Sequence, residues 1–461
     1  MINMKQYRYS YLLGASLLMA ACQPGQPKEA QDMVHLITLA PGHFHAALVQ
    51  KTATPGIDSI VHVYAPQGPE LEAHLNLIKQ YNERPTDPTH WKEEVYTGAD
   101  WLEKLKSERK GSVVVLAGNN HDKTRYIDAA VQAGMHVLAD KPMAITEADF
   151  TSLRKSFADA GAAKVLLYDI MTERSEITNI LQKELLRDAT VFGDMQPGTP
   201  EKPAIEIESI HHFYKMVSGK PLRRPTWFFD PSQQGDALVD VNTHLVDLTH
   251  WMLFDTIALD YTKDIQLNKS VKWKTPLTLA QFSTITGADA FPDFLKTYVK
   301  DSVAGIAANG TVDYKVKGFH VRLSALWNFE APAGGGDTHF AIARGSRSNI
   351  VIRQGAEESW KPELFVEPIA ADTAFAATLE AAVKRLATKY PGISVEARGK
   401  QFHIAIPQEL KTGHEAHFAE VLQRYLGFLK AGAVPTWEVK NMIAKYYVTT
   451  AGQAMAKEIT K

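Results

Sequence analysis

The chain has 461 residues, with 50 Lys and Arg against 52 Asp and Glu, and a formal net charge of −2 at pH 7. This balance, together with the lack of a long basic run, argues against nucleic acid as a partner. A hydrophobic content of 45% over this length suffices for two domains, each with its own core.

The N-terminal segment has the features of an export signal. Two basic residues precede an apolar run at 11–19, and small residues then lead to Cys22, the only cysteine of the chain. The run is shorter than the roughly 20 residues of a membrane-spanning helix, so we predict a cleaved signal peptide over 1–22. Residues 18–22 are similar to a bacterial lipobox, which predicts lipidation of Cys22 and a flexible tether over 23–33. An ordinary signal that ends near a cysteine is the alternative.

The predicted location is therefore the periplasm or cell envelope, with the lipid on Cys22 as the only contact with a membrane. A single cysteine also excludes an intramolecular disulfide.

Apolar strands then alternate with amphipathic helices. We predict strands at 34–39, 60–64, 113–116, 136–139 and 165–168, and helices at 70–81, 101–106, around 127–134 and about 147–160. Gly134 is the expected stop of one helix, and Thr146 with Asp149 forms a capping-box pattern at the start of the next. Alternation of this kind predicts a doubly wound parallel sheet over 34–168.

The most informative unit begins at the buried strand 113–116. A polar loop with Asn119 and Asn120 follows it, and the next strand delivers Asp140 and Lys141 at its carboxyl end. Ligands of open α/β sheets bind outside the carboxyl ends of the strands. We therefore expect both asparagines and the lysine to face one crevice.

This unit resembles a known enzyme family. The segments Asn120-His121, Ala133-Gly134-x-His136 and Val137-Leu138-x-Asp140-Lys141-Pro142 follow, without a gap, the pattern of the glucose-fructose oxidoreductase, inositol dehydrogenase and MocA family. Asp140 stands where Glu is commoner. The resemblance implies a Rossmann domain, NAD or NADP as cofactor, and a carbohydrate or cyclitol substrate.

By the same resemblance, the loop after the first strand takes the place of the dinucleotide fingerprint. Small residues there let the backbone approach a pyrophosphate, but Ala40 and His45 occupy two of the three glycine positions and only Gly42 remains. His43 and His45 are candidates to contact phosphate or substrate instead. No acid ends the strand at 60–64, so NAD versus NADP stays open. The predicted cofactor-binding residues are Ala40, Gly42, His43, Phe44, His45, Asn119, Asn120 and Lys141.

The second domain, predicted over 169–461, contains a helix whose side chains are suited to acid–base chemistry. Its apolar stripe consists of Leu245, Leu248, Trp251 and Met252. Asp240, His244 and Asp247 recur at offsets of four and three on another face. The segment is similar to the family's substrate-domain helix, and by that resemblance Lys141, Asp240 and His244 correspond to its catalytic triad. His suits the base that takes a hydroxyl proton, and Lys can stabilise negative charge on the same oxygen.

Other candidates are less specific. His211, His212, Trp227 and Asp247 are predicted to bind substrate, although aromatic residues are also ordinary core material. His414 and His417 form a His-x-x-His pair, but no third ligand stands at a characteristic spacing, so no metal site is predicted.

The rest of this domain favours an α+β architecture. Period-two alternation predicts strands at 321–329, 338–343 and 349–353, and helices follow at 418–430 and 437–455. We expect an open, largely antiparallel sheet with one face buried. The resemblance implies that its other face can serve a homo-oligomer contact.

The combined prediction is an exported, lipid-anchored oxidoreductase that uses NAD or NADP to oxidise a ring hydroxyl of a sugar, glycoside or cyclitol. A redox-neutral, NAD-dependent glycosidase is the second hypothesis. A non-catalytic sugar-binding lipoprotein is the third, because the residues at 40–45 depart from the fingerprint.

Overall fold

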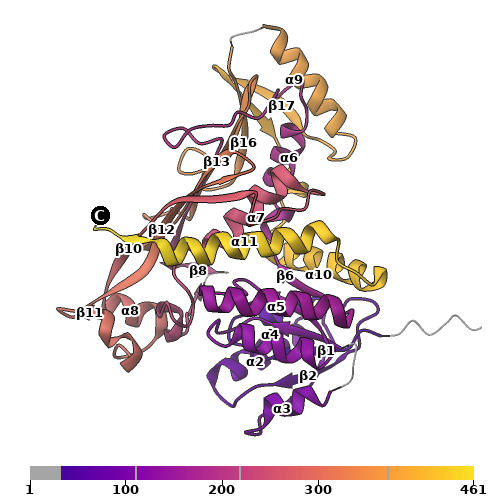
Figure 1. Cartoon of the computed structure of the whole chain (residues 1–461), viewed down its shortest axis with the longest axis vertical. Coiled ribbons are helices and arrows are strands. Elements are labelled where there is room, and N and C mark those ends of the chain that lie inside the picture. The colour runs from indigo at the N-terminus through magenta and orange to yellow at the C-terminus, as the bar shows by residue number, and fades with distance from the viewer. Residues whose placement is uncertain (1–32, 109–111, 218–219, 371–372, 461) are drawn as a thin grey trace, which may run out of the picture.

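The computed structural model describes residues 33–108, 112–217, 220–370 and 373–460. The predicted signal peptide, Cys22 and all but the last residue of the predicted tether lie outside the described residues. The described chain forms two large sheets and a two-stranded hairpin, and the smaller of the two large sheets lies below the larger one in Figure 1. None of the helices in these ranges is both long enough and apolar enough to cross a bilayer.

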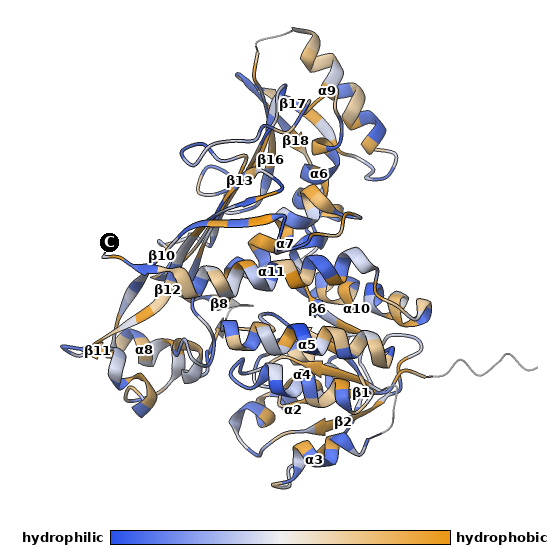
Figure 2. Cartoon of the chain, viewed as in Figure 1, coloured by the Kyte–Doolittle hydropathy of each residue, from blue (hydrophilic) through white to orange (hydrophobic). Residues whose placement is uncertain are grey.

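The smaller sheet has six strands in the order β3-β2-β1-β4-β5-β6, and all of its pairs are parallel. This order defines a doubly wound Rossmann domain and confirms the predicted fold class. The strands are β1 (Leu36–Leu39), β2 (Ile60–Tyr64), β3 (Lys92–Tyr96), β4 (Val113–Leu116), β5 (His136–Asp140) and β6 (Leu167–Ile170). Figure 2 shows the central strands mainly in orange, as expected for strands buried on both faces.

The connecting helices follow the capping signals of the sequence. Thr146 and Asp149 form the predicted capping box, and Gly134 adopts a φ of 75° after the helix it ends. Helix α1 is much shorter than a normal crossover helix. The helices are α1 (His45–Leu48), α2 (Pro69–Glu83), α3 (Trp101–Lys106), α4 (Lys123–Gln132) and α5 (Glu147–Ala163).

The larger sheet has 11 strands, and its central order is β16-β15-β14-β7-β13-β12-β10. Its pairs are antiparallel except β7 with β13 and β10 with β19, which confirms a largely antiparallel sheet. The strands are β7 (Ile205–Tyr214), β10 (Ile265–Thr278), β11 (Val299–Lys300), β12 (Val303–Val316), β13 (Phe319–Glu330), β14 (Thr338–Arg344), β15 (Ser348–Gln354), β16 (Glu363–Pro368), β17 (Ser394–Arg398), β18 (Gln401–Ala405) and β19 (Lys457–Glu458). A separate hairpin pairs β8 (Met216–Val217) with β9 (Lys220–Pro221).

Helices cover one face of this sheet and bridge to the Rossmann domain (Figure 1). They are α6 (Ile177–Leu186), α7 (Val241–Phe254), α8 (Leu279–Thr286), α9 (Thr373–Leu386), α10 (His414–Ala431) and α11 (Thr436–Met455). Four short 3₁₀ turns join these elements: η1 (Glu173–Ser175), η2 (Thr226–Phe229), η3 (Asp293–Tyr298) and η4 (Gln408–Leu410). Helix α11 contacts α5 of the first domain as well as α7 and β10 of the second.

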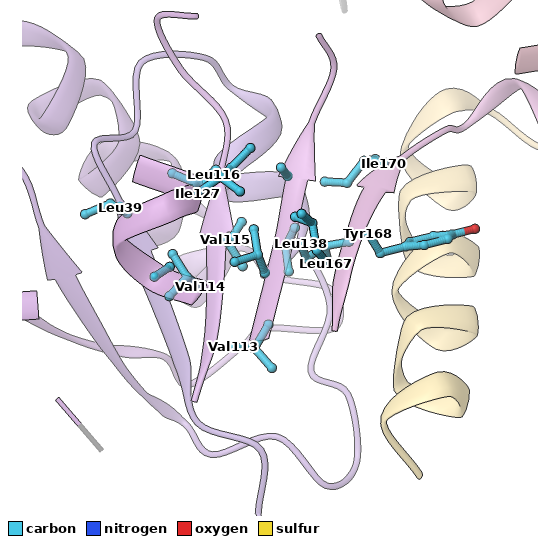
Figure 3. Packing of buried hydrophobic residues seen from close by; sticks show 14 of the residues in the cluster. Leu39, Val113, Val114, Val115, Leu116, Ile127, Leu138, Leu167, Tyr168 and Ile170 are labelled. Carbon is cyan, nitrogen blue, oxygen red and sulfur yellow. The ribbon is translucent and has the colours of Figure 1, made fainter. Parts of the chain in front are cut away.

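The last two helices complete the core of the first domain. Phe418, Tyr425 and Tyr446 belong to the same buried cluster as the strands of the Rossmann sheet. Figure 3 shows Tyr168 directed from β6 towards a C-terminal helix, and its ring lies 5.3 Å from that of Phe428. The chain therefore returns to its first domain after building the second.

A buried ionic network also joins the two domains. Arg174 donates to both oxygens of Asp247 at 2.6 and 2.8 Å and to Glu438 at 2.9 and 3.0 Å. Lys445 contacts Asp247 at 2.8 Å and Asp169 at 2.6 Å. Burial alone would raise the pKa of Asp247, but the two cations outweigh it and hold that pKa well below its usual range. Asp247 therefore fixes the domains rather than a substrate, contrary to our prediction.

We expect Asp247→Ala to lower the free energy of unfolding by about 3–5 kcal/mol, because Arg174 and Lys445 would lose a shared counter-ion in a buried site. Urea unfolding at neutral pH measures this loss. Asp122→Ala is the matched control, since Asp122 is 41% exposed and faces Arg125 at 3.6 Å, and should cost no more than about 1 kcal/mol. Equal losses in both variants would contradict the role assigned to the network.

Candidate active site

Two distant segments meet at the carboxyl edge of the Rossmann sheet. Lys141, the first residue after β5, donates from Nζ to Oδ1 of Asp240 at 2.6 Å, although the residues are 99 positions apart. Asp240 directly precedes α7 as its N-cap, whereas we had expected it within the helix. The end of β5 and the start of α7 are therefore in direct contact.

His244 stands in the first turn of α7, four residues after Asp240. It lines a pocket of about 200 Å³, and its buried Nδ1 has no hydrogen-bond partner among the described residues. Burial, helped by the charge of Lys141, holds the pKa of His244 well below 6.5. The imidazole is therefore neutral at pH 7 and able to accept a proton.

Lys141 is in the opposite state. Burial favours a lower pKa, but the carboxylates of Asp240 and Asp140 outweigh it and raise the pKa of Lys141. A protonated amine thus lies near enough to a neutral imidazole for its charge to act on it, which suits transfer of a proton to the imidazole while the amine stabilises an oxyanion.

The pocket beside His244 is rich in polar groups. His211 Nδ1 lies 3.3 Å from Asp337 Oδ2, and Ser209 Oγ lies 2.7 Å from His339 Nδ1. Such convergent donors and acceptors are typical of sites for small polar ligands. His211 is the one predicted substrate residue that reaches this pocket together with His244.

Glu173 is a member of this pocket that we did not predict. Burial, with a contribution from Glu176, raises its pKa to about 7. It follows β6 by three residues, so the rule that ligands gather at the carboxyl ends of strands contained the signal for it.

A second pocket, of about 350 Å³, lies where a Rossmann domain binds its dinucleotide. Ala40 and Gly42 after β1, the segment after β2, and Asn119 after β4 line it. The loops approach closely: a Cβ on Gly118 would lie 2.5 Å from the Ala40 oxygen, so only glycine fits there. Trp227 and Gln233 of the second domain also line this pocket, and Asn119 Nδ2 donates to Gln233 Oε1 at 2.8 Å.

The loop itself departs from a standard fingerprint. Helix α1 has four residues, and the N–H groups of Gly42 and His43 donate to Ala117 O at 3.1 and 3.2 Å. A pyrophosphate would therefore not sit on the helix N-terminus as in the usual arrangement.

Other residues offer the groups that a dinucleotide needs. A neighbouring pocket of about 460 Å³ shares Gly42 with the pocket of about 350 Å³. Its lining includes His43, Phe44, Glu70, Arg223 and Arg224. The guanidinium groups suit phosphates, and Glu70, near the end of β2, suits ribose hydroxyls. We regard the pair of pockets as fitting NAD or NADP with an altered pyrophosphate loop.

Five predicted residues have positions other than those expected. Asn120 binds the second domain through its side-chain donation to Gln234 O at 2.8 Å. The Nδ1 atoms of His45 and His212 lie 2.9 and 3.0 Å from Asp140 and Asp337. Trp227 lies on the nucleotide side, and Asp247 is held in the ionic network. These positions depend on contacts between side chains far apart in the sequence, which local sequence patterns do not reveal.

The site and fold define an oxidoreductase with a Rossmann domain, and comparison with known proteins agrees. Residues 37–167 match the description "Oxidoreductase family, NAD-binding Rossmann fold", and residues 181–457 match "Putative oxidoreductase C terminal domain". The chain belongs to this oxidoreductase family, of the glucose-fructose oxidoreductase, inositol dehydrogenase and MocA type. No curated protein matches the sequence.

Solved structures extend the comparison. A "putative oxidoreductase from Parabacteroides merdae" is 47% identical, with a TM-score of 0.90 over 92% of this chain and 97% of that one. KijD10, a 3-ketoreductase from Actinomadura kijaniata in complex with NADP and TDP-benzene, is 14% identical, with a TM-score of 0.55 over 93% and 99% of the two chains. A "putative oxidoreductase from Thermotoga maritima" is 11% identical, with a TM-score of 0.57 over 92% and 97%. The last two similarities show the fold alone.

Proposed function

We propose that the protein is a dehydrogenase that oxidises a ring hydroxyl of a sugar, glycoside or cyclitol. The observation that carries the proposal is the 2.6 Å contact of Lys141 with Asp240, the N-cap of the helix that carries His244. His244 takes the hydroxyl proton, Lys141 donates a hydrogen bond to the same oxygen, and Asp240 positions Lys141. A bound nicotinamide ring supplies the hydride acceptor.

We further propose NAD rather than NADP as the cofactor. Glu70 lies in both pockets near the end of β2, where its carboxylate could bind ribose hydroxyls and would repel a 2′-phosphate. Glu70→Gln is the matched variant to test the preference, since it removes the charge and keeps the size.

A redox-neutral glycosidase is the second candidate, and Glu173 is the observation in its favour. Elimination after transient oxidation needs a further group that exchanges protons, and Glu173 lines the pocket of His244 with a pKa of about 7. At a pH below about 7 the carboxyl group of Glu173 is protonated and can donate to the leaving oxygen. At a higher pH the carboxylate has no proton to donate.

The loss of this proton as pH rises predicts the pH profile. We expect kcat/KM for a glycoside to fall as pH rises above about 7, and the Glu173→Gln variant to lose this limb because it cannot titrate. Initial rates from pH 5.5 to 9 measure it. Glu147→Gln, an exposed acid at the start of α5, is the control and should keep the wild-type profile. A wild-type limb in Glu173→Gln would remove Glu173 from the proton path.

Mass spectrometry of nucleotide released from denatured protein tests the proposed function first. NAD together with reduced cofactor and an oxidised sugar, after incubation with a panel of glycosides, would support the dehydrogenase. Free aglycone without net reduction would support the glycosidase. Absence of nucleotide and of turnover, even with added NAD and NADP, would support a non-catalytic sugar-binding protein and overturn both enzyme proposals.

We also propose that the protein is a lipoprotein of the cell envelope, anchored through Cys22, on the strength of the lipobox-like sequence alone. Cys22→Ala should abolish labelling with a fatty-acid analogue. We propose, from the family resemblance alone, that the larger sheet forms a homo-oligomer contact. Sedimentation velocity measures the oligomeric state.

A further inference from the structure

Three side chains with metal-binding atoms meet beside the candidate active site. His45 Nδ1 lies 2.9 Å from Asp140 Oδ2, and His43 Nδ1 lies 3.9 Å from the same oxygen. The three ligand atoms all lie within 4.8 Å of one another. We propose that His43, His45 and Asp140 form a site for a divalent transition-metal ion of the Zn²⁺ type.

The ligand set and its spacing suit such an ion. Two imidazole nitrogens and one carboxylate are a common set for catalytic zinc, whereas Mg²⁺ and Ca²⁺ prefer oxygen ligands alone. Bonds of about 2.0–2.2 Å in tetrahedral geometry separate ligand atoms by roughly 3.3–3.6 Å. The observed 2.9 and 3.9 Å lie on either side of this range, so small side-chain rotations would bring the atoms into place.

The burial of the cluster also suits a metal. The side chains of His43, His45 and Asp140 are 25%, 11% and 7% exposed, which shields the ligands and leaves an entry path at His43. His43 also lines the pocket of about 460 Å³, so a vacant coordination position would face a ligand-sized space. Three protein ligands with one open position are typical of catalytic rather than structural zinc.

The backbone on both sides of the cluster is held in place. His43 N–H donates to Ala117 O at 3.2 Å, and buried Lys123 donates from Nζ to Asp140 O at 2.9 Å. Two hydrogen bonds compete at the ligand atoms. His45 N–H donates to His43 Nδ1 at 3.4 Å, which is too long to commit that lone pair strongly, and His45 Nδ1 pairs with Asp140 Oδ2 at 2.9 Å, a bond that a metal would replace.

Two departures from the family pattern coincide at this place. His45 occupies a position where the fingerprint has glycine, and Asp140 stands where Glu is commoner, yet the two side chains are in contact across 95 positions. A simple hydrogen-bonded His45–Asp140 pair would explain this contact without a metal, but it gives no role to His43, which faces the same carboxylate. The inference is independent of the proposed function, because proton transfer by His244 and Lys141 requires no metal.

Metal content and binding test the proposal without an activity assay. The full chain, purified without chelators, should contain about one equivalent of zinc or a related metal by plasma mass spectrometry. After chelator treatment, titration with ZnCl₂ should show one saturable site, with affinity at least about 100-fold lower in His43→Ala and in His45→Ala. MgCl₂ should show no saturable binding.

The control is His62→Ala, which removes an imidazole that lies 3.7 Å from Glu94 in the same domain, outside the cluster, and should leave zinc affinity unchanged. Thermal unfolding of each metal-free variant checks its fold, and the Co²⁺ spectrum of the wild type gives a second measurement. A wild type without a saturable zinc site, or a folded His43→Ala/His45→Ala double variant that binds like the wild type, would overturn the proposal. A double variant that does not fold leaves His43→Ala alone to decide, since its side chain is the most exposed of the three.

Discussion

Replacement of Lys141 by alanine is expected to lower kcat at least about 1000-fold, equivalent to about 4 kcal/mol of lost transition-state stabilisation. The ammonium is held 2.6 Å from Asp240 and can donate a hydrogen bond to an oxyanion that forms beside it. Loss of the amine removes that stabilisation. Steady-state rates on the first substrate identified measure the effect.

Lys141→Ala leaves Asp240 buried without its partner, so a second variant separates chemistry from folding. Lys141→Gln keeps a hydrogen-bond donor for Asp240 but removes the charge, and should be as inactive with a smaller loss of stability. Lys155→Ala is the control, because Lys155 is 66% exposed and pairs with Asp159 on the surface of α5. Lys141 variants that turn over at near wild-type rates would remove the lysine from the proposed chemistry.

Replacement of His244 by alanine is expected to lower kcat by about 100- to 10,000-fold, the usual contribution of a positioned general base. Because burial and Lys141 hold the pKa of His244 well below 6.5, the wild type should keep its activity as pH falls through 6.5. Protonation of the imidazole then removes the base only at lower pH. A pH series of kcat/KM measures both the loss and the position of the acid limb.

Two further variants make this prediction specific. His90→Ala removes an exposed imidazole of the first domain and should leave both rate and pH profile unchanged. His244→Gln keeps a polar side chain of similar size but no base, and added imidazole should restore part of the activity of His244→Ala. If His244→Gln works at near wild-type rates, another group is the base.

The first domain was largely predictable because its signals are local. The buried run of β4, the capping box at Thr146 and the glycine stop at Gly134 each fix a boundary through short-range chemistry. The strand order then follows from alternation of strands and helices, which allows few topologies.

The long strands of the second domain were less predictable. β10 pairs with β12 across register shifts between Leu267 and Lys269 and between Trp273 and Thr275. Each irregularity breaks the period-two pattern by which a strand is found in sequence. β7, the partner of β13 and β14, was likewise not predicted as a strand.

Site residues were predictable where a specific sequence motif marked them. Lys141 and Asp240 meet as expected, since both follow specific motifs. Asp247 was misplaced because its position on a helical face carries no information about Arg174 or Lys445, whose approach depends on the tertiary fold. Glu173 was missed although it follows a strand end, because its raised pKa depends on burial in the folded chain.

The return of the final helices to the Rossmann core has a consequence for biosynthesis. Phe418, Tyr425 and Tyr446 supply part of a core whose strands were synthesised hundreds of residues earlier. The core of the first domain therefore cannot be completed until the last segment of the chain has been synthesised, and the β6 side of that core stays uncovered until then. Transient exposure of this apolar surface during synthesis is the consequence of such an order of assembly.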